Sequence, residues 1–153
     1  MADFSALYGD LRDRMVDHID KAGSSIDLVV YEIRSEDIVD ALIAAKRRGV
    51  RVRIIVDSVH SPVATYQEKA LEDEGIAVKR IGGGNTRKLL HDKFILFDGS
   101  EASTPSYNRS AKSLRGPGRE ENAFTRDKAL IEKLNAQFDE FWNTSGQNEI
   151  PQN

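Results

Sequence analysis

Two apolar segments separated by an amphipathic one limit the folds that this chain can adopt. Residues 26–33 and 50–56 are rich in isoleucine and valine and are more continuously apolar than alternating. Such segments are typical of strands buried on both faces, as in parallel sheets. Between them, Ser35 is placed to cap a helix that Gly49 ends. The pattern therefore predicts a parallel β-α-β unit, because parallel strands need a crossover between them.

The remaining segments predict further layers around this unit. Apolar side chains recur at helical spacing in residues 3–22, and Gly23 follows. Ser61-Pro62 predicts the start of a helix that extends to about Gly75. The other expected elements are strands at 76–81, 89–97, 100–104 and 122–125, a turn at Asp98-Gly99, a short helix at 106–114 and a final helix at 128–143. Together they predict an α/β fold in which a mixed, mostly parallel sheet is sandwiched between helices, with the site in loops after the strand ends.

The length of the chain and the distribution of its charges narrow the function. A chain of 153 residues suits a single domain, spanning 1–153 with a core at about 24–145. The apolar runs are too short to cross a membrane and the first residues carry no secretory pattern, so we expect a cytoplasmic protein without a membrane partner. The net charge of −3 conceals a basic middle segment, since residues 76–121 contain 9 Lys/Arg against 5 Asp/Glu. This segment suits an anionic partner, and a solvated basic surface is the alternative.

His91 and Lys93 form the centre of the candidate site. On a strand, alternation places both side chains on one face and that of Asp92 on the other. A nucleophile and a cation then share one wall of a pocket. Asp98 follows at the end of the strand, where a carboxylate pairs with a cation or accepts backbone hydrogen bonds. A histidine beside a lysine on a strand commonly has a structural role. The surrounding residues are therefore needed to decide whether this pair is catalytic.

The surrounding sequence resembles the phospholipase D superfamily. The pattern of that family is His-x-Lys, four residues, Asp, six residues, Gly-Ser, and then Asn. This chain carries its counterpart in residues 90–99, in Thr104-Pro105-Ser106-Tyr107-Asn108 and in Glu121-Asn122, with Pro105 in place of the glycine. Residues 44–57 also resemble the helix, glycine and strand that precede the motif in the family. The resemblance therefore covers about residues 24–126.

The resemblance and the chemistry of a phosphodiester together suggest a role for each residue. Cleavage needs a nucleophile, an acid for the leaving oxygen, and donors for the non-bridging oxygens. His91 is the expected nucleophile, with its other ring nitrogen held by Glu121 in preference to Glu120. The other expected catalytic residues are Lys93, Ser106 and Asn108, which hold the phosphate, and Asp98, which organises the lysine and its loop. The expected substrate-binding residues are Arg87, Lys88, Tyr107, Arg109, Lys112 and Arg115.

The acid is missing from a single copy of the motif, because His18 and His60 lie outside any matching pattern. Family members with one motif pair as homodimers, so the resemblance implies a two-fold axis that brings two copies of His91 together through the active-site face. It also implies a covalent phosphohistidine intermediate and no metal or other cofactor.

Three function classes remain open at this point. The first is a nuclease, an endonuclease acting on DNA or RNA, which the basic middle segment favours. The second is a hydrolase or transferase of phospholipids or other phosphodiesters, for which we expect an interfacial apolar helix that the sequence does not show. The third is a catalytically weak nucleic-acid-binding module, suggested by Pro105 and by the dependence of one motif on assembly.

Overall fold

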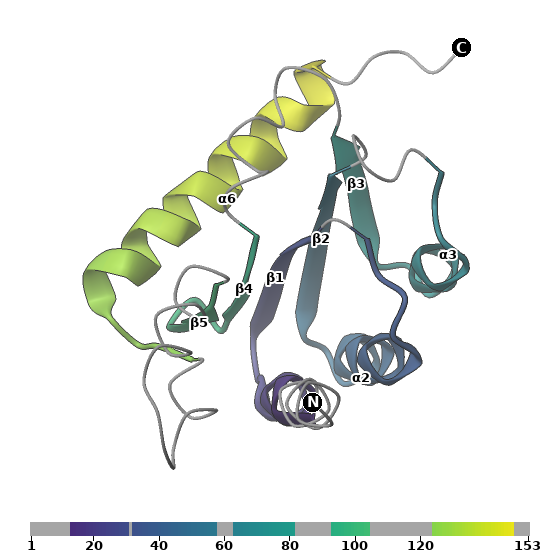
Figure 1. The fold of residues 1–153 in the computed structure, drawn as a ribbon, viewed down its shortest axis with the longest axis horizontal. Helices are drawn as coiled ribbons and strands as arrows, with labels where there is room; N and C mark the ends of the chain where they lie inside the picture. Colours follow the sequence, from purple (N-terminus) through teal and green to yellow (C-terminus); the bar gives the residue numbers. More distant parts are fainter. Residues whose placement is uncertain (1–12, 31, 58–62, 82–92, 105–123, 149–153) are drawn as a thin grey trace, which may run out of the picture.

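The computed structural model describes residues 13–30, 32–57, 63–81, 93–104 and 124–148 (Figure 1). Within these ranges a helix at residues 13–21 precedes the first strand. The strands are β1 (Ser25–Val30), β2 (Arg51–Asp57), β3 (Ala77–Ile81), β4 (Phe94–Phe97) and β5 (Glu101–Ser103), and the other helices are α2 (Glu36–Arg47), α3 (Tyr66–Asp73) and α6 (Lys128–Asn148).

The five described strands form one sheet in the order β3-β2-β1-β4-β5. β1 pairs in parallel with β2, and β2 pairs in parallel with β3. β4 is antiparallel to both of its neighbours, β1 and β5. Four of these strands therefore point in one direction and β4 points in the other. The predicted mixed, mostly parallel sheet and the initial parallel β-α-β unit are confirmed.

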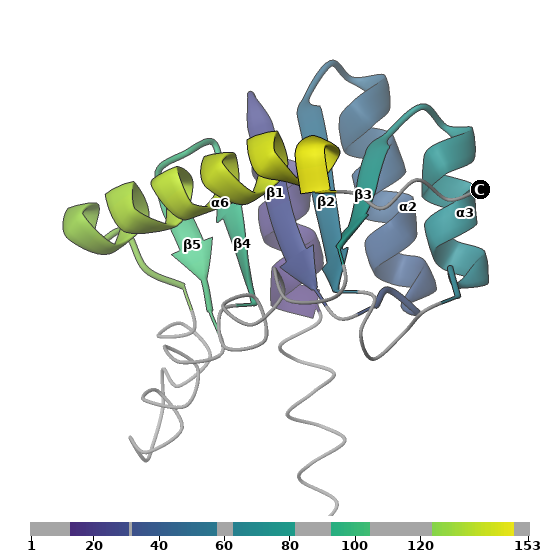
Figure 2. The same ribbon diagram turned by 90° about the horizontal axis from the view of Figure 1, so that it is seen from above.

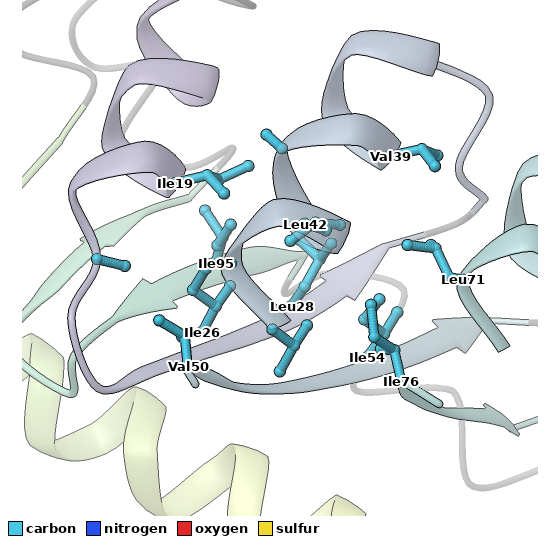
Figure 3. Packing of buried hydrophobic residues seen from close by; sticks show 14 of the residues in the cluster. Ile19, Ile26, Leu28, Val39, Leu42, Val50, Ile54, Leu71, Ile76 and Ile95 are labelled. Carbon is cyan, nitrogen blue, oxygen red and sulfur yellow. The ribbon is translucent and has the colours of Figure 1, made fainter. Parts of the chain in front are cut away.

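Helices cover both faces of the sheet (Figures 1 and 2). The 13–21 helix, α2 and α3 lie on one face, and α6 crosses the other. Alternation along the strands divides the core accordingly, because Ile26 and Leu28 of β1 join the first cluster whereas Val29 joins the cluster under α6. Figure 3 shows the first cluster, in which Leu42 of α2 meets side chains of the strands. Burial on both faces explains why the strand sequences are continuously apolar.

The boundaries of α2 follow its predicted caps. The hydroxyl of Ser35 accepts a hydrogen bond from the backbone N–H of Ile38 at 3.3 Å. At the other end Gly49 has a φ of +99°, a left-handed conformation that glycine adopts without steric cost. The helix therefore begins and ends where the sequence indicated.

The predicted start of α3 at Ser61-Pro62 is wrong. The helix begins at Tyr66, and Thr65 caps it. The Thr65 hydroxyl accepts from the N–H of Glu68 at 3.0 Å, while the Glu68 carboxylate accepts from the N–H of Thr65 at 3.1 Å. This reciprocal capping box satisfies two N–H groups at once, which a Ser-Pro pair does not. Residues 61 and 62 themselves lie outside the described ranges.

The first strand was predicted to continue to Ile33 but ends at Val30. The reason is that the backbone of Ile33 bonds to α3 instead of to a strand. Its N–H donates to the Glu68 carboxylate at 2.9 Å, and its carbonyl accepts from the Thr65 hydroxyl at 2.7 Å. Apolar sequence alone does not distinguish these two sets of partners.

The other elements differ from prediction mainly in length. The final helix continues to Asn148 instead of ending at 143. Of the strand expected at 122–125, the described residues, 124 and 125, contribute a single bridge between Thr125 and Ala102. Of the strand expected at 89–97, the described part forms from Phe94 onward, and the short helix expected at 106–114 lies outside the described residues.

An ion pair is buried between the sheet and α6. Asp27 of β1, 3% exposed, accepts two hydrogen bonds from Arg53 of β2 at 2.9 and 3.0 Å. The same guanidinium reaches Asp139 of α6 at 3.3 Å and lies over the rings of Phe138 and Trp142. Two strands and the helix that covers them are thereby joined at one charged group.

Removing one member of this pair is expected to destabilise the fold. Asp27→Ala leaves the Arg53 charge without its main partner, and the expected loss is about 3 kcal/mol of unfolding free energy. The double variant Asp27→Leu/Arg53→Met removes both charges and is expected to recover much of that loss. Urea denaturation of the three proteins measures the difference, and an unchanged midpoint for Asp27→Ala would contradict the assigned role of the pair.

Candidate active site at the carboxyl edge of the sheet

One edge of the sheet collects the segments that carry the predicted site. β1, β2, β3 and β5 end at this edge, and β4 begins there (Figure 2). Ligands in α/β sheets bind outside the carboxyl ends of the parallel strands. Residues 82–92 connect the end of β3 to Lys93, and residues 105–123 follow Thr104 after β5. The topology therefore delivers both halves of the motif to the same edge.

Most of the predicted site residues lie outside the described ranges. This applies to the catalytic candidates His91, Ser106, Asn108 and Glu121, and to the substrate-binding candidates Arg87, Lys88, Tyr107, Arg109, Lys112 and Arg115. Their roles stay predictions. Lys93 and Asp98 are the two members of the set that the structure describes.

Lys93 lies at the carboxyl edge and is 7% exposed. The β1–β4 pairs run from Ile26 with Phe97 to Val29 with Phe94, so the next pair in this register is Val30 with Lys93. Lys93 is therefore almost wholly enclosed beside two paired strands. A cation enclosed in this way at the carboxyl edge is a candidate group for binding an anion there.

The chain leaves β5 close to Lys93. The β4–β5 pairs run from Phe97 with Glu101 to Ile95 with Ser103, so that Thr104 falls opposite Phe94. Thr104 is 8% exposed, and the predicted Ser106 follows it by two residues. The lysine and the start of the serine segment therefore belong to adjacent strand ends, as the chemistry requires.

Asp98 lies at the opposite end of β4 from Lys93. Its carboxylate accepts hydrogen bonds from the backbone N–H groups of Gly23, Ser24 and Ser25 at 2.7 to 3.2 Å, and from the Ser24 hydroxyl at 3.0 Å. Asp98 itself has a φ of 57° and Gly99 has 68°, the conformation of a tight hairpin turn. The carboxylate thus fixes the loop before β1. The expectation that it also organises the lysine does not fit this placement, because the length of β4 separates the two residues.

These contacts also determine the protonation of Asp98. Partial burial acts to raise the pKa of its carboxyl group, but the hydrogen bonds from Ser24, Ser25 and Gly23 outweigh burial and place the pKa below its ordinary value of 3.8. Because its pKa is lower in the folded state than in the unfolded chain, the carboxylate stabilises the fold at pH values above its ordinary pKa. This contribution is lost as the pH falls through the folded-state pKa.

Asp98→Asn is therefore expected to lower the unfolding free energy by about 1 kcal/mol at neutral pH, a modest figure because the carboxylate is solvent-exposed. The difference in unfolding free energy between the variant and the wild type is expected to disappear below pH 3.8. Urea denaturation as a function of pH measures both effects. A gap that persisted unchanged into acid would show that charge on Asp98 is not what holds the loop.

A buried polar cluster at the same edge was not predicted from the sequence. Glu68 is fully buried, and besides the N–H groups of Ile33 and Thr65 its carboxylate binds the guanidinium of Arg80, near the end of β3. The pattern Thr-x-x-Glu in residues 65–68 was the available signal for the capping box. The burial of the glutamate depends on partners distant in sequence, which no local pattern shows.

An aliphatic pocket of about 310 Å³ lies beside the edge, between the 13–21 helix, α2 and β1. Val30 and Ile95 form part of its lining, and Arg34 and Glu32 contribute charged groups. Val30 is also the residue that falls opposite Lys93, so the pocket borders the candidate site. Its lining is mostly hydrocarbon, so the pocket itself suits an anionic group poorly.

Within the described ranges, no group of three or more His, Asp or Glu side chains is placed to hold a metal ion. In the same part of the chain, none of the helices has both the length and the apolar character to cross a bilayer.

Comparison with known proteins agrees with the fold and with the family resemblance. Residues 15–142 match the family described as cardiolipin synthase, PLD-like domain. The chain belongs to the phospholipase D superfamily. It is 29% identical over 129 residues to a mitochondrial cardiolipin hydrolase from Chlamydomonas reinhardtii, covering 84% of this chain and 56% of that protein. The chain thus spans about half the length of the curated relatives that it matches.

Two solved structures have the same fold. Nuc from Salmonella typhimurium, a phospholipase D family member, is 25% identical with a TM-score of 0.62, and the match covers 86% of each chain. NucT from Helicobacter pylori is 18% identical with a TM-score of 0.65 over 88% of each chain, which is a likeness of fold.

Proposed function

We propose that this chain is a phosphodiesterase of the phospholipase D type, and that it hydrolyses nucleic acid as an endonuclease through a phosphohistidine on His91. The observation that carries the proposal is the enclosed position of Lys93 at the carboxyl edge. The segment that contains Ser106 begins at the neighbouring strand end, where β5 finishes. The motif spacing from His91 to Ser106 fits the same reaction.

The reaction proceeds in two displacements. A ring nitrogen of His91 attacks phosphorus, the bond to the leaving oxygen breaks, and the His91 of a second copy donates a proton to that oxygen. A water molecule then attacks phosphorus and gives a proton to the second histidine. The bond between phosphorus and the first histidine breaks, and both rings return to their starting states. Lys93, Ser106 and Asn108 donate to the non-bridging oxygens, and Glu121 holds the other ring nitrogen of the nucleophile.

Two observations favour nucleic acid as the substrate. The basic middle segment, residues 76–121, carries the motif and gives the site region a positive charge, although the whole chain is acidic. The similarity to Nuc also extends over 86% of both chains, whereas the cardiolipin hydrolases contain much that this chain does not match. The names of those relatives support a second candidate, hydrolysis of a phospholipid such as cardiolipin.

Metal independence gives the first test. The wild type is expected to cleave labelled DNA or RNA in excess chelator, and His91→Ala is expected to lower the rate at least about 10³-fold, because the nucleophile is removed. His60→Ala, a histidine outside the motif, serves as the control and is expected to retain activity. Acid-labile labelling of the wild type by a phosphorylated substrate would identify the covalent intermediate. Activity that His91→Ala retained, or that chelator abolished, would refute the proposal.

Dimerisation gives the second test. We expect sedimentation of a species with twice the mass of the chain, and specific activity that falls on dilution below the dimer dissociation constant, because each site needs two copies of His91. A monomer with full specific activity would rule out the shared site.

The two candidate substrates are separated by a parallel assay. Vesicles containing cardiolipin are offered under the conditions of the nucleic-acid assay, and release of phosphatidic acid is measured. Turnover of nucleic acid alone is the expected result. Turnover of the vesicles alone would establish the second candidate instead.

A further inference from the structure

Arg80 and Lys93 lie in one row across the sheet. Arg80 of β3 pairs with Val56 of β2, and Val56 pairs with Val30 of β1. Val30 in turn falls opposite Lys93 in the β1–β4 register. We call these four residues the edge row. It runs along the carboxyl edge of the sheet and has a cationic side chain at each end.

The residues of the edge row also lie on one face of the sheet. Val56 belongs to the core cluster under α2 and α3, and Val30 packs against that cluster. Val78, two residues before Arg80 on β3, packs against the same cluster. Residues that pair across strands share a face, as do residues two apart along a strand. Arg80 and Lys93 therefore start on the same side of the sheet, and three strand spacings place their backbones about 14 Å apart.

A buried carboxylate fixes the position of Arg80. Glu68, with its side chain 1% exposed, binds the Arg80 guanidinium, whose own side chain is 22% exposed. Glu68 is itself held by the N–H groups of Ile33 and Thr65. The arginine is thus anchored from the interior while part of it reaches solvent at the edge. A guanidinium carries five N–H donors in a planar fork that matches phosphate as well as carboxylate.

We propose that Arg80 is a second phosphate-binding residue, which contacts a nucleic-acid strand about 14 Å along the edge from the phosphate held by Lys93. Glu68 acts as its positioning residue. This inference rests on the proposed function and deepens it, because it makes the substrate a polyanion that extends across the ends of four strands. Backbone contacts of this kind add affinity without sequence preference.

The test compares a long single-stranded oligonucleotide with bis(p-nitrophenyl) phosphate, a diester with one phosphate. The main variant is Glu68→Gln/Arg80→Gln, which removes both charges and so leaves no unpaired carboxylate in the interior. It is expected to raise KM and the dissociation constant for the oligonucleotide about tenfold, and to reduce the slope of log affinity against log salt by about one. The kcat on bis(p-nitrophenyl) phosphate is expected to stay unchanged.

Two further variants separate binding from a structural effect. Arg80→Lys keeps the cation and is expected to retain the wild-type salt slope, with weaker affinity because the fork is lost. Arg47→Gln/Glu74→Gln removes an Arg–Glu pair that joins the other ends of α2 and α3, with its closest contact at 2.7 Å. This matched control is expected to behave as the wild type with both substrates.

The outcomes are distinct. Equal loss of activity with both substrates, or a wild-type salt slope in the main variant, would overturn the role of Arg80 while leaving the proposed function intact. Absence of cleavage by the wild type would overturn the proposed function, and the oligonucleotide dissociation constants would then still decide whether Arg80 binds phosphate.

Discussion

β1 pairs in parallel with β2 on one side and antiparallel with β4 on the other, and the position of the candidate site depends on both registers. Side chains alternate between two buried faces, so a slip of one residue would exchange the two core clusters. The same slip would move Lys93 away from its place opposite Val30. Packing of apolar side chains is therefore what sets the location of the candidate site.

Each face of the sheet also encloses a carboxylate bound to an arginine. Asp27 and Arg53 connect β1 and β2 under α6, whereas Glu68 and Arg80 connect α3 to β3 on the other face. Removing such charges from water costs free energy. Close pairing offsets that cost only when further hydrogen bonds occupy the remaining lone pairs of the carboxylate. Arg53 also reaches Asp139 of α6, so each arginine connects the sheet to a helix that covers it and fixes how the two layers pack.

Local patterns in the sequence predicted the elements, and long-range contacts decided where they end. Ser35 and Gly49 act within a few residues of themselves, and their roles were predictable. The end of β1 was not, because Ile33 bonds to Thr65 and Glu68, more than thirty residues away. For the site, the spacing of the motif singled out Lys93 and Asp98 as candidates but did not assign the contacts of Asp98. Its partners at the start of β1 are more than seventy residues away.

The placement of Asp98 gives the spacing of the motif a physical meaning. The four residues between Lys93 and Asp98 are β4 itself, so the interval in the pattern is the length of one strand. Lys93 lies at the carboxyl edge, where we propose that phosphate binds, and Asp98 holds the other end of β4 to the start of β1. The interval between them is thus a structural requirement, because it sets how far the lysine lies from the point where the strand is anchored. A relative in which the aspartate is replaced is expected to differ from this chain in how β4 is anchored, and not in the groups proposed to bind phosphate.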